Sequence, residues 1–376
     1  MYLNEIARTQ PIQRSGVLGK LAEKLPVPNG EQIFHPIFTA FNYTNICNAR
    51  CAMCLEDANH KGFPPFSLDE ATKVLTQIAD QIQTRDKGYL HLWGGEPFID
   101  LELLYGIIEV ADKLGFNWVE VATNGFWGKA VDRARIILSE IRKRISRLAF
   151  SLQISCDNFH NLDQVILNVE YLANIIYLVK TEFSAVAIRI NCVGLKDFTS
   201  QHNLAAALGR KIPDSSSFFD ARGEVEQNNF IIISNNRNSR IPTSIFSPSM
   251  SGRCNEELSH LFSGERVNPN KVPLIRMPLE PNISIGVDRQ FYISLQFTSP
   301  CILSMGDIGT HSVAELVARV EADPIAVSLL KHGYSEIYPN LKEVFPQFDL
   351  LARRFYSVYD ILKGLEVDNP FDVLSV

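Results

Sequence analysis

Short apolar runs alternate with longer amphipathic stretches along much of the chain, between about residues 37 and 234. The strands expected are 37–41, 89–93, 118–122, 148–155, 186–190 and 230–233. The helices expected between them are 67–83, 101–114, 131–144, 162–180 and 204–208. This alternation favours an α/β fold, a parallel sheet with helices outside. Polar and glycine-rich residues follow several strands, so we expect the chemistry at the carboxyl ends of the strands.

The two ends of the chain depart from this pattern. Residues 1–36 contain several prolines and are expected to form a lead-in with one short helix at about 16–25. The later elements expected are strands at 283–286 and 291–293, joined around Asp288-Arg289, and helices at 312–321 and 341–365. The predicted parts are therefore a lead-in at 1–36, an α/β region at 37–240 and a C-terminal region at 241–376.

Composition excludes several broad classes. Among 376 residues, 36 are Lys or Arg and 42 are Asp or Glu, which gives a net charge of −6 and no basic patch of the kind that binds nucleic acid. No stretch of about 18 apolar residues occurs, so we expect no membrane span. Seven cysteines, an odd number, argue against a disulfide framework. A cytoplasmic protein with no nucleic-acid or membrane partner is expected.

Three cysteines lie close together just after the first predicted strand. Cys47, Cys51 and Cys54 are spaced so that one loop can aim three sulfurs at one point. Thiolates suit iron–sulfur clusters or zinc. Structural zinc takes four protein ligands, and His60 is a conceivable fourth, whereas a four-iron cluster on three cysteines leaves one iron open. Three unrelated buried cysteines are the remaining alternative.

Two further motifs end the next two strands, Gly94-Gly95-Glu96-Pro97 and Thr123-Asn124-Gly125. Together with the cysteine spacing, they resemble the radical S-adenosylmethionine (SAM) superfamily over about residues 37–234. The resemblance implies a partial (β/α)6 parallel barrel with a small α+β C-terminal extension. It also implies one [4Fe–4S] cluster on the three cysteines, SAM on the open iron, and an electron donor such as flavodoxin or ferredoxin. Reductive cleavage of SAM would yield a 5′-deoxyadenosyl radical that abstracts a substrate hydrogen.

The resemblance, together with strand periodicity, points to a set of residues around SAM. These are Met53, Gly94, Gly95, Glu96, Pro97, Thr123, Asn124, Ser155, Asp157, Arg189, Asn191 and Ile232. Met53 stands where the family often has an aromatic residue, and methionine can pack on a ring through its sulfur. Simpler interpretations remain open: a tight turn at the glycine pair, a helix start at Pro97, a turn at Asp157-Asn158 and ordinary sheet core at Ile232.

Two further polar residues near the strand ends each have two possible interpretations. Arg189 lies within an apolar strand, where an unpaired charge is unfavourable, so a carboxylate partner is expected from SAM or from an internal Asp or Glu. His160 is a candidate catalytic acid or base, the alternative being a surface-loop histidine.

The C-terminal region resembles a degraded SPASM or twitch extension, the tail of many peptide-modifying radical SAM enzymes. The resemblance lies in residues 285–294 and in 306–308 through 312–316, with Ser294 where the family usually has a cysteine. Beyond residue 240 only Cys254 and Cys301 remain, too few to complete a second cluster without help. We therefore expect one cluster, and a redox-neutral reaction is favoured because no extra cluster accepts an electron.

The substrate expected is a ribosomal peptide or a natural-product intermediate. A sugar or aminocyclitol is the alternative within the same chemistry. A non-catalytic metal-binding regulator on the same scaffold is the alternative from a different class, and it predicts no cleavage of SAM.

Overall fold

A computed structural model describes most of the chain, and every structural statement below refers to the part that it describes. The described residues are 12–51, 54, 58, 63–82, 88–158, 160, 168–193, 198–212, 217–220, 229–232, 240–246, 281–294, 303–349 and 365. The chain divides into two compact units. The first unit is Met1–Phe41, Thr76–Gly88 and Ser249–Val376, and the second unit is Asn42–Leu75 and Tyr89–Pro248.

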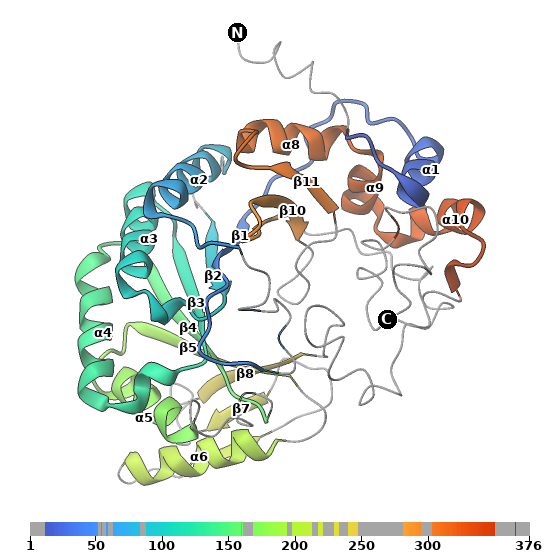
Figure 1. Cartoon of the computed structure of the whole chain (residues 1–376). Coiled ribbons are helices and arrows are strands. Elements are labelled where there is room, and N and C mark those ends of the chain that lie inside the picture. The colour runs from blue at the N-terminus through green and yellow to red at the C-terminus, as the bar shows by residue number, and fades with distance from the viewer. Residues whose placement is uncertain are drawn as a thin grey trace. The chain divides into compact units, whose positions relative to one another are not determined.

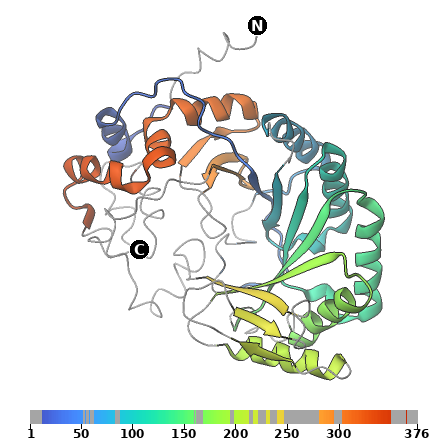
Figure 2. The same ribbon diagram turned by 180° about the vertical axis from the view of Figure 1, so that it is seen from behind.

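The second unit is a sheet whose long strands run parallel and alternate with helices. Its strands are β2 (Tyr89–Gly94), β3 (Trp118–Thr123), β4 (Ala149–Ser155), β5 (Val186–Val193) and β8 (Arg240–Phe246), each parallel to the next. Its helices are α3 (Leu101–Leu114), α4 (Val131–Arg144), α5 (Val169–Thr181) and α6 (Thr199–Lys211). These helices line the outer side of the sheet in Figure 1, and Figure 2 shows the same layers from behind. The predicted α/β fold is confirmed.

Local signals explain why the elements begin and end where they do. The Asp100 side chain accepts a hydrogen bond from the Leu103 N–H at 3.0 Å and caps the start of α3. Gly115 ends the same helix with φ 82°, a conformation that favours glycine. At α2 (Leu68–Gln81), the Ser67 and Glu70 side chains each accept from the other's backbone N–H and so form a capping box.

The two faces of this sheet differ in polarity. Leu90, Leu92 and Val121 are fully buried on the face that meets the apolar stripes of the helices. The alternate positions on the other face include several polar residues, and His91 of β2 stands in register with Glu120 of β3. The sheet therefore carries an apolar core on its helical side and a row of polar side chains on the opposite side.

The end of this unit corrects one sequence prediction. Residues 230–233 were expected to form the sixth parallel strand, but β7 (Asn229–Ile232) runs antiparallel between β8 and β6 (Phe218–Asp220). The strand that pairs parallel with β5 is β8, which the sequence analysis did not predict. Pro242 precedes the residues of β8 that pair with β5, so its missing N–H leaves the parallel ladder intact. Helix α6 is also longer than the predicted 204–208.

The first unit contains a small sheet and a group of helices. Strand β9 (Asn282–Ile285) pairs antiparallel with β10 (Gln290–Ser294), which pairs antiparallel with β11 (Leu303–Asp307). This confirms the predicted hairpin, in which Arg289 adopts φ 62°. The first part of β1 (Phe38–Thr44) pairs parallel with β9, Phe38 opposite Asn282.

The helices of the first unit are α1 (Gly16–Lys24), α8 (Val313–Ala322), α9 (Pro324–His332) and α10 (Tyr334–Val344). Helices α1 and α8 confirm the predictions at 16–25 and 312–321. The helix predicted at 341–365 overlaps α10 only at 341–344, because α10 begins at Tyr334 and ends at Val344. Residues 350–364 of the predicted helix lie outside the described residues. The sequence prediction missed α9 although Asp323 and Pro324 form a helix start, with the Asp323 side chain accepting from the Ala326 N–H at 2.8 Å.

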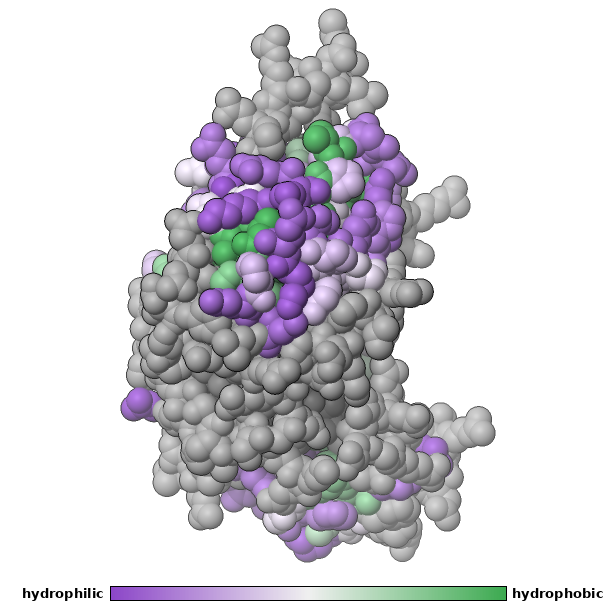
Figure 3. All heavy atoms as spheres, turned by 90° about the vertical axis from the view of Figure 1, so that its right-hand side faces the viewer, coloured by the Kyte–Doolittle hydropathy of each residue, from purple (hydrophilic) through white to green (hydrophobic). Residues whose placement is uncertain are grey.

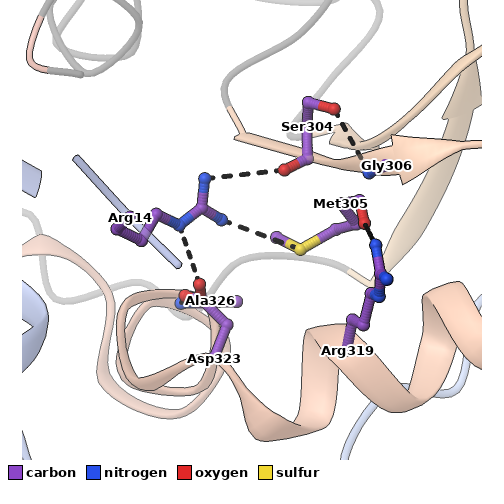
Figure 4. A network of polar contacts seen from close by, with 7 residues as sticks. All are labelled: Arg14, Ser304, Met305, Gly306, Arg319, Asp323 and Ala326. Atoms are coloured by element: carbon purple, nitrogen blue, oxygen red, sulfur yellow. Dashed lines mark hydrogen bonds and ion pairs between the residues drawn. The ribbon is translucent and has the colours of Figure 1, made fainter. Parts of the chain in front are cut away.

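A buried polar network joins the N-terminal segment to this helical group (Figure 4). The Arg14 Nε lies 2.8 Å from the Asp323 Oδ2, and the two side chains are 3% and 0% exposed. The other Arg14 nitrogens reach the Ser304 carbonyl at 3.5 Å and the Met305 sulfur at 3.7 Å. Arg319 donates to the Met305 carbonyl at 3.1 Å. The network ties Arg14, β11, α8 and α9 together.

The surface shown in Figure 3 is mostly hydrophilic where its residues are described, with a few apolar side chains between the polar ones. Among the described residues, no helix has both the length and the apolar character that crossing a membrane requires.

Candidate functional site

The three motif cysteines lie in the loop that follows β1. Cys47, Cys51 and Cys54 are all half-buried. The Cys47 sulfur accepts the Ala49 N–H at 3.4 Å, and the Cys54 sulfur accepts the Ala58 N–H at 3.4 Å. Backbone N–H groups that point at sulfur stabilise thiolates and are typical of iron–sulfur loops. The loop itself therefore prepares these sulfurs for a metal cluster.

Burial raises the pKa of the Cys47 thiol to about 12, against a smaller opposing effect of its backbone hydrogen bond. Negative charge on Glu96, Cys51 and Cys54 raises the pKa of this thiol further. Without a metal, Cys47 is a neutral thiol at physiological pH. A bound metal must therefore displace its proton, as thiolate ligation requires.

The glycine pair at the end of β2 holds the stem of the cysteine loop. The Gly95 N–H donates to the Thr44 carbonyl at 2.7 Å, and the Glu96 N–H donates to the Ile46 carbonyl at 2.8 Å. A Cβ atom on Gly95 would lie 2.1 Å from the Ile46 oxygen, and one on Gly94 would lie 2.1 Å from the Asn42 Oδ1. Only glycine permits this approach. The close contact observed is with the chain's own backbone, and contact of the pair with SAM stays a prediction.

Glu96 lies between the ends of β2 and β3 and is buried, with 1% of its surface exposed. Its Oε1 accepts from the Thr123 hydroxyl at 2.8 Å and from the Phe98 N–H at 3.1 Å, and its Oε2 accepts from the Asn124 N–H at 2.7 Å. Pro97 opens a short 3-10 helix (Pro97–Ile99), so the expected helix start at this proline is present. The Glu96 carboxyl group thus joins two of the three motifs.

Burial raises the pKa of Glu96 to about 7, and its three hydrogen bonds only partly oppose this. The folded protein then binds this proton more tightly than the unfolded chain, whose carboxyl has its ordinary pKa of 4.5. The resulting stability is complete below pH 4.5 and is lost as pH rises through about 7. Relative to Glu96→Gln, we expect the wild type to lose about 3 kcal/mol of unfolding free energy between these limits. Urea denaturation of both proteins across this pH range measures it, and parallel pH profiles would contradict the assignment.

Asn124 connects the hydrogen bonds of Glu96 to the cysteine loop. Its Nδ2 donates to the Asn48 Oδ1 at 2.9 Å, and Asn48 lies next to Cys47. Thr123 also accepts from the Trp127 Nε1 at 3.1 Å and from the Gly125 N–H at 3.0 Å. Hydrogen bonds therefore run from Glu96 through Asn124 to Asn48, and the structure brings together all three motifs that the sequence singled out.

Asp157 and His160 lie in the segment that follows the carboxyl end of β4. The Asp157 Oδ1 accepts from the His160 backbone N–H at 3.0 Å and lies 2.9 Å from the His160 Nδ1, so the expected turn at Asp157 is present. The His160 side chain is 14% exposed and therefore not a surface-loop histidine. Burial alone would lower the pKa of His160, but the Asp157 carboxylate and the Cys51 sulfur raise it well above its ordinary value.

Arg189 pairs with a carboxylate of the protein itself. Its Nη2 forms an ion pair with the Glu120 Oε2 and donates to the Gln153 Oε1 at 3.3 Å. Of the two carboxylate partners considered for Arg189, the structure therefore contains the one supplied by the protein. A role of Arg189 and Asn191 toward SAM stays a prediction. Beside this pair, burial lowers the pKa of His91 to about 4, so that imidazole is neutral. The sequence analysis missed Glu120 and His91, although both interrupt apolar strands as Arg189 does.

Several predicted residues lie outside the described part of the chain. They are Met53, His60, Cys254 and Cys301. The backbone of Ile232 lies opposite Arg240 in the antiparallel strand β7, whereas its predicted place near SAM assumed a parallel strand. Ser155 ends β4 half-buried, and its contact with SAM stays a prediction.

The three motif cysteines supply the number and kind of donors that a cluster requires. In the described ranges, no three His, Cys, Asp or Glu side chains are grouped so as to hold a metal ion. The three cysteines nevertheless share one loop, and the sulfurs of Cys47 and Cys54 each accept a backbone N–H. A cluster binds each thiolate through a different iron, so its ligands need not meet at one ion. The donors fit a cluster in chemistry and number.

Comparison with known proteins identifies the segment that contains these motifs. Residues 41–206 match the family model described as the radical SAM superfamily. The chain carries a radical SAM domain. The match confirms the resemblance inferred from the three motifs and the prediction of a radical SAM enzyme. Enzymes of this family use a [4Fe–4S] cluster and SAM. Curated proteins gave no match.

Solved structures similar to this chain include anSMEcpe with bound AdoMet, at 14% identity and a TM-score of 0.48, covering 84% of this chain and 98% of that one. SuiB of Streptococcus suis bound to S-adenosylmethionine is 10% identical with a TM-score of 0.45, covering 79% and 68%. BtrN in complex with AdoMet and 2-DOIA is 9% identical with a TM-score of 0.42, covering 90% and 97%.

Proposed function

We propose that the protein holds one [4Fe–4S] cluster on Cys47, Cys51 and Cys54 and uses it to generate a 5′-deoxyadenosyl radical from SAM. The observation that carries the proposal is the continuous set of hydrogen bonds from Glu96 through Asn124 to Asn48. It connects the ends of β2 and β3 to the cysteine loop. A bare structural metal loop would not need this buried carboxyl group and glycine pair beside it.

The chain's own residues are proposed to bind and orient SAM. The backbone of Gly94–Pro97 and the Glu96 carboxyl group are proposed to face the methionyl ammonium of SAM, while Ser155, Asp157, Arg189 and Asn191 are proposed toward its carboxylate and ribose. When bound, the cluster supplies the electron for reductive cleavage of SAM, and the 5′-deoxyadenosyl radical abstracts a substrate hydrogen. The electron comes from a small redox protein such as flavodoxin or ferredoxin.

The proposed substrate is a ribosomal peptide or a natural-product intermediate. Support for a peptide comes from the tail, whose SPASM-like sequence at 285–294 forms the β9–β10 hairpin and is followed by β11 and α8. Serine at position 294, where the family usually has cysteine, favours a single cluster and a redox-neutral reaction. A sugar or aminocyclitol is the competing substrate class, and binding of a leader peptide to the purified protein separates the two.

The first experiment is anaerobic reconstitution with iron and sulfide, followed by reduction with SAM and chromatography for 5′-deoxyadenosine. We expect the wild type to produce it and Cys51→Ala to produce none, because that variant removes a cluster ligand. The matched control is Cys192→Ala, since Cys192 is a buried thiol of β5 and 1% exposed. Absence of 5′-deoxyadenosine, with zinc bound in place of iron, would instead indicate a non-catalytic regulator.

A further inference from the structure

Trp93 is the last residue of β2 whose side chain lies on the polar face of the sheet, the face that carries His91 and Glu120. Its ring stacks on the His91 imidazole, with 6.1 Å between the ring centroids and 18° between the ring planes. Gly94 and Gly95 follow directly, and their backbone is proposed above to face SAM. Trp93 therefore borders the proposed SAM contacts without being one of them.

The indole N–H of Trp93 is buried and has no hydrogen-bond partner among the described residues. The other two tryptophans of the chain both donate to hydroxyl groups. Trp118 donates to Ser151 at 2.7 Å, and Trp127 donates to Thr123 at 3.1 Å. Buried polar groups of native proteins are nearly always paired with protein, water or ligand. The Trp93 N–H is therefore a donor whose acceptor the described residues do not supply.

The charges next to the Trp93–His91 stack are matched within the protein. Glu120, in register with His91, forms an ion pair with Arg189. Gln153, in register with Arg189, accepts from it at 3.3 Å. The His91 imidazole is neutral, since burial lowers its pKa to about 4. Among the described side chains, this part of the polar face thus presents an unpaired donor and no unmatched charge.

Such a place selects a neutral group that accepts a hydrogen bond. A carboxylate or a phosphate would bring a buried negative charge without a cation to pair with it. A hydroxyl group would bring a donor of its own, and the nearby Gln153 and Glu120 oxygens already accept from Arg189. An amide carbonyl brings only acceptors to the indole, because the N–H of a trans amide points to the opposite side. The amide is therefore the group that fits.

We propose that Trp93 is a substrate-recognition residue whose indole N–H donates to an amide carbonyl of the substrate. Of the substrate classes considered above, this favours a peptide. The inference rests on the proposed function, because it takes the substrate to lie beside SAM on the polar face of the sheet. It gives Trp93 a role in binding the substrate and none in the cleavage of SAM.

The test is nuclear magnetic resonance of the reconstituted full-length protein, with isotope-labelled tryptophan. Each of the three indole N–H groups gives one signal, and the variants Trp93→Phe and Trp118→Phe assign them. The probe is N-acetylglycinamide, added with and without SAM. We expect the Trp93 proton signal to move downfield and to saturate, because donation to a carbonyl deshields the proton. The signals of Trp118 and Trp127 are expected to stay in place, because both groups already have partners.

The same two variants measure the contribution of the hydrogen bond. Trp93→Phe keeps an aromatic ring beside His91 but lacks the N–H, whereas Trp118→Phe lacks an N–H whose partner is the protein's own Ser151. Saturation transfer to the acetyl methyl group of the probe gives its half-saturating concentration. We expect this concentration to rise about tenfold in Trp93→Phe and to stay unchanged in Trp118→Phe.

Two comparison probes are sodium acetate, a charged acceptor, and myo-inositol, a hydroxyl acceptor. A Trp93 response to either that equals the response to the amide overturns the inference. A signal that moves with SAM alone also overturns it and leaves the proposed function standing, because Trp93 would then contact SAM. A signal that no probe moves overturns it as well, since water would then satisfy the N–H. A protein that holds no cluster and cleaves no SAM overturns the proposed function, whatever the Trp93 signal does.

Discussion

Replacing Arg14 with methionine is expected to lower the free energy of unfolding of the first unit by about 3–5 kcal/mol. Methionine roughly preserves the length of the side chain but leaves the Asp323 carboxylate, 0% exposed, without its cation. An uncompensated charge in a buried site is more destabilising than the loss of the contact itself. Urea denaturation followed by circular dichroism at neutral pH measures the difference.

Two further variants test this explanation. Lys24→Met breaks the Lys24–Glu343 pair, whose side chains are 46% and 61% exposed, and is expected to change stability by less than about 1 kcal/mol. Combining Arg14→Met with Asp323→Asn removes the stranded charge and keeps an N-cap side chain on α9, so part of the loss is recovered. An Arg14→Met protein as stable as Lys24→Met would show that the buried pair contributes little.

Replacing Gly95 with alanine is expected to abolish cluster retention, reducing iron from about four per chain to less than about one. The new methyl group would lie 2.1 Å from the Ile46 oxygen and 2.7 Å from the Asn45 carbonyl carbon. Both are backbone atoms, so the side chain cannot avoid them by rotating. The stem of the cysteine loop must move instead, and with it the sulfur of Cys47. Iron analysis and the visible absorbance of the reconstituted protein measure the effect.

The matched control for this variant is Gly209→Ala on α6. A Cβ atom there meets nothing closer than 3.6 Å, and alanine is a better helix former than glycine. We expect Gly209→Ala to keep its iron and its cleavage of SAM. A Gly95→Ala protein that also kept both would mean that the loop tolerates displacement of its stem.

The elements predicted best were those whose signals are local. Helices α3 and α4 were predicted with their observed bounds. In α3 the amphipathic pattern agrees with the cap at Asp100 and the glycine at position 115, whereas α4 has no side-chain cap and follows its amphipathic pattern alone. The three motifs were found because each follows a strand that its own apolar residues define. Their mutual contacts join separate strands and loops, so no local pattern contains them.

The elements predicted worst were those in which local and tertiary signals disagree. Strand β8 contains Pro242 and two hydroxyl residues, which favour a loop, and its pairing with β5 makes it a strand. Helix α10 contains Pro339, a residue that is unfavourable inside a helix, and the sequence prediction placed no helix at this position. The burial of Arg189 predicted that it pairs with a carboxylate. The sequence could not identify Glu120 as the partner, because that choice depends on the order of the strands in the sheet.

The register of β1 with β9 has a consequence for biosynthesis. Phe38 emerges from the ribosome long before its partner Asn282, and at ordinary elongation rates the delay is on the order of tens of seconds. Over that interval the first part of β1 presents an unpaired edge, the kind of surface on which nascent chains aggregate. Such long-range pairing also slows folding. Arrest of translation before residue 282 would thus yield a nascent chain that needs a chaperone.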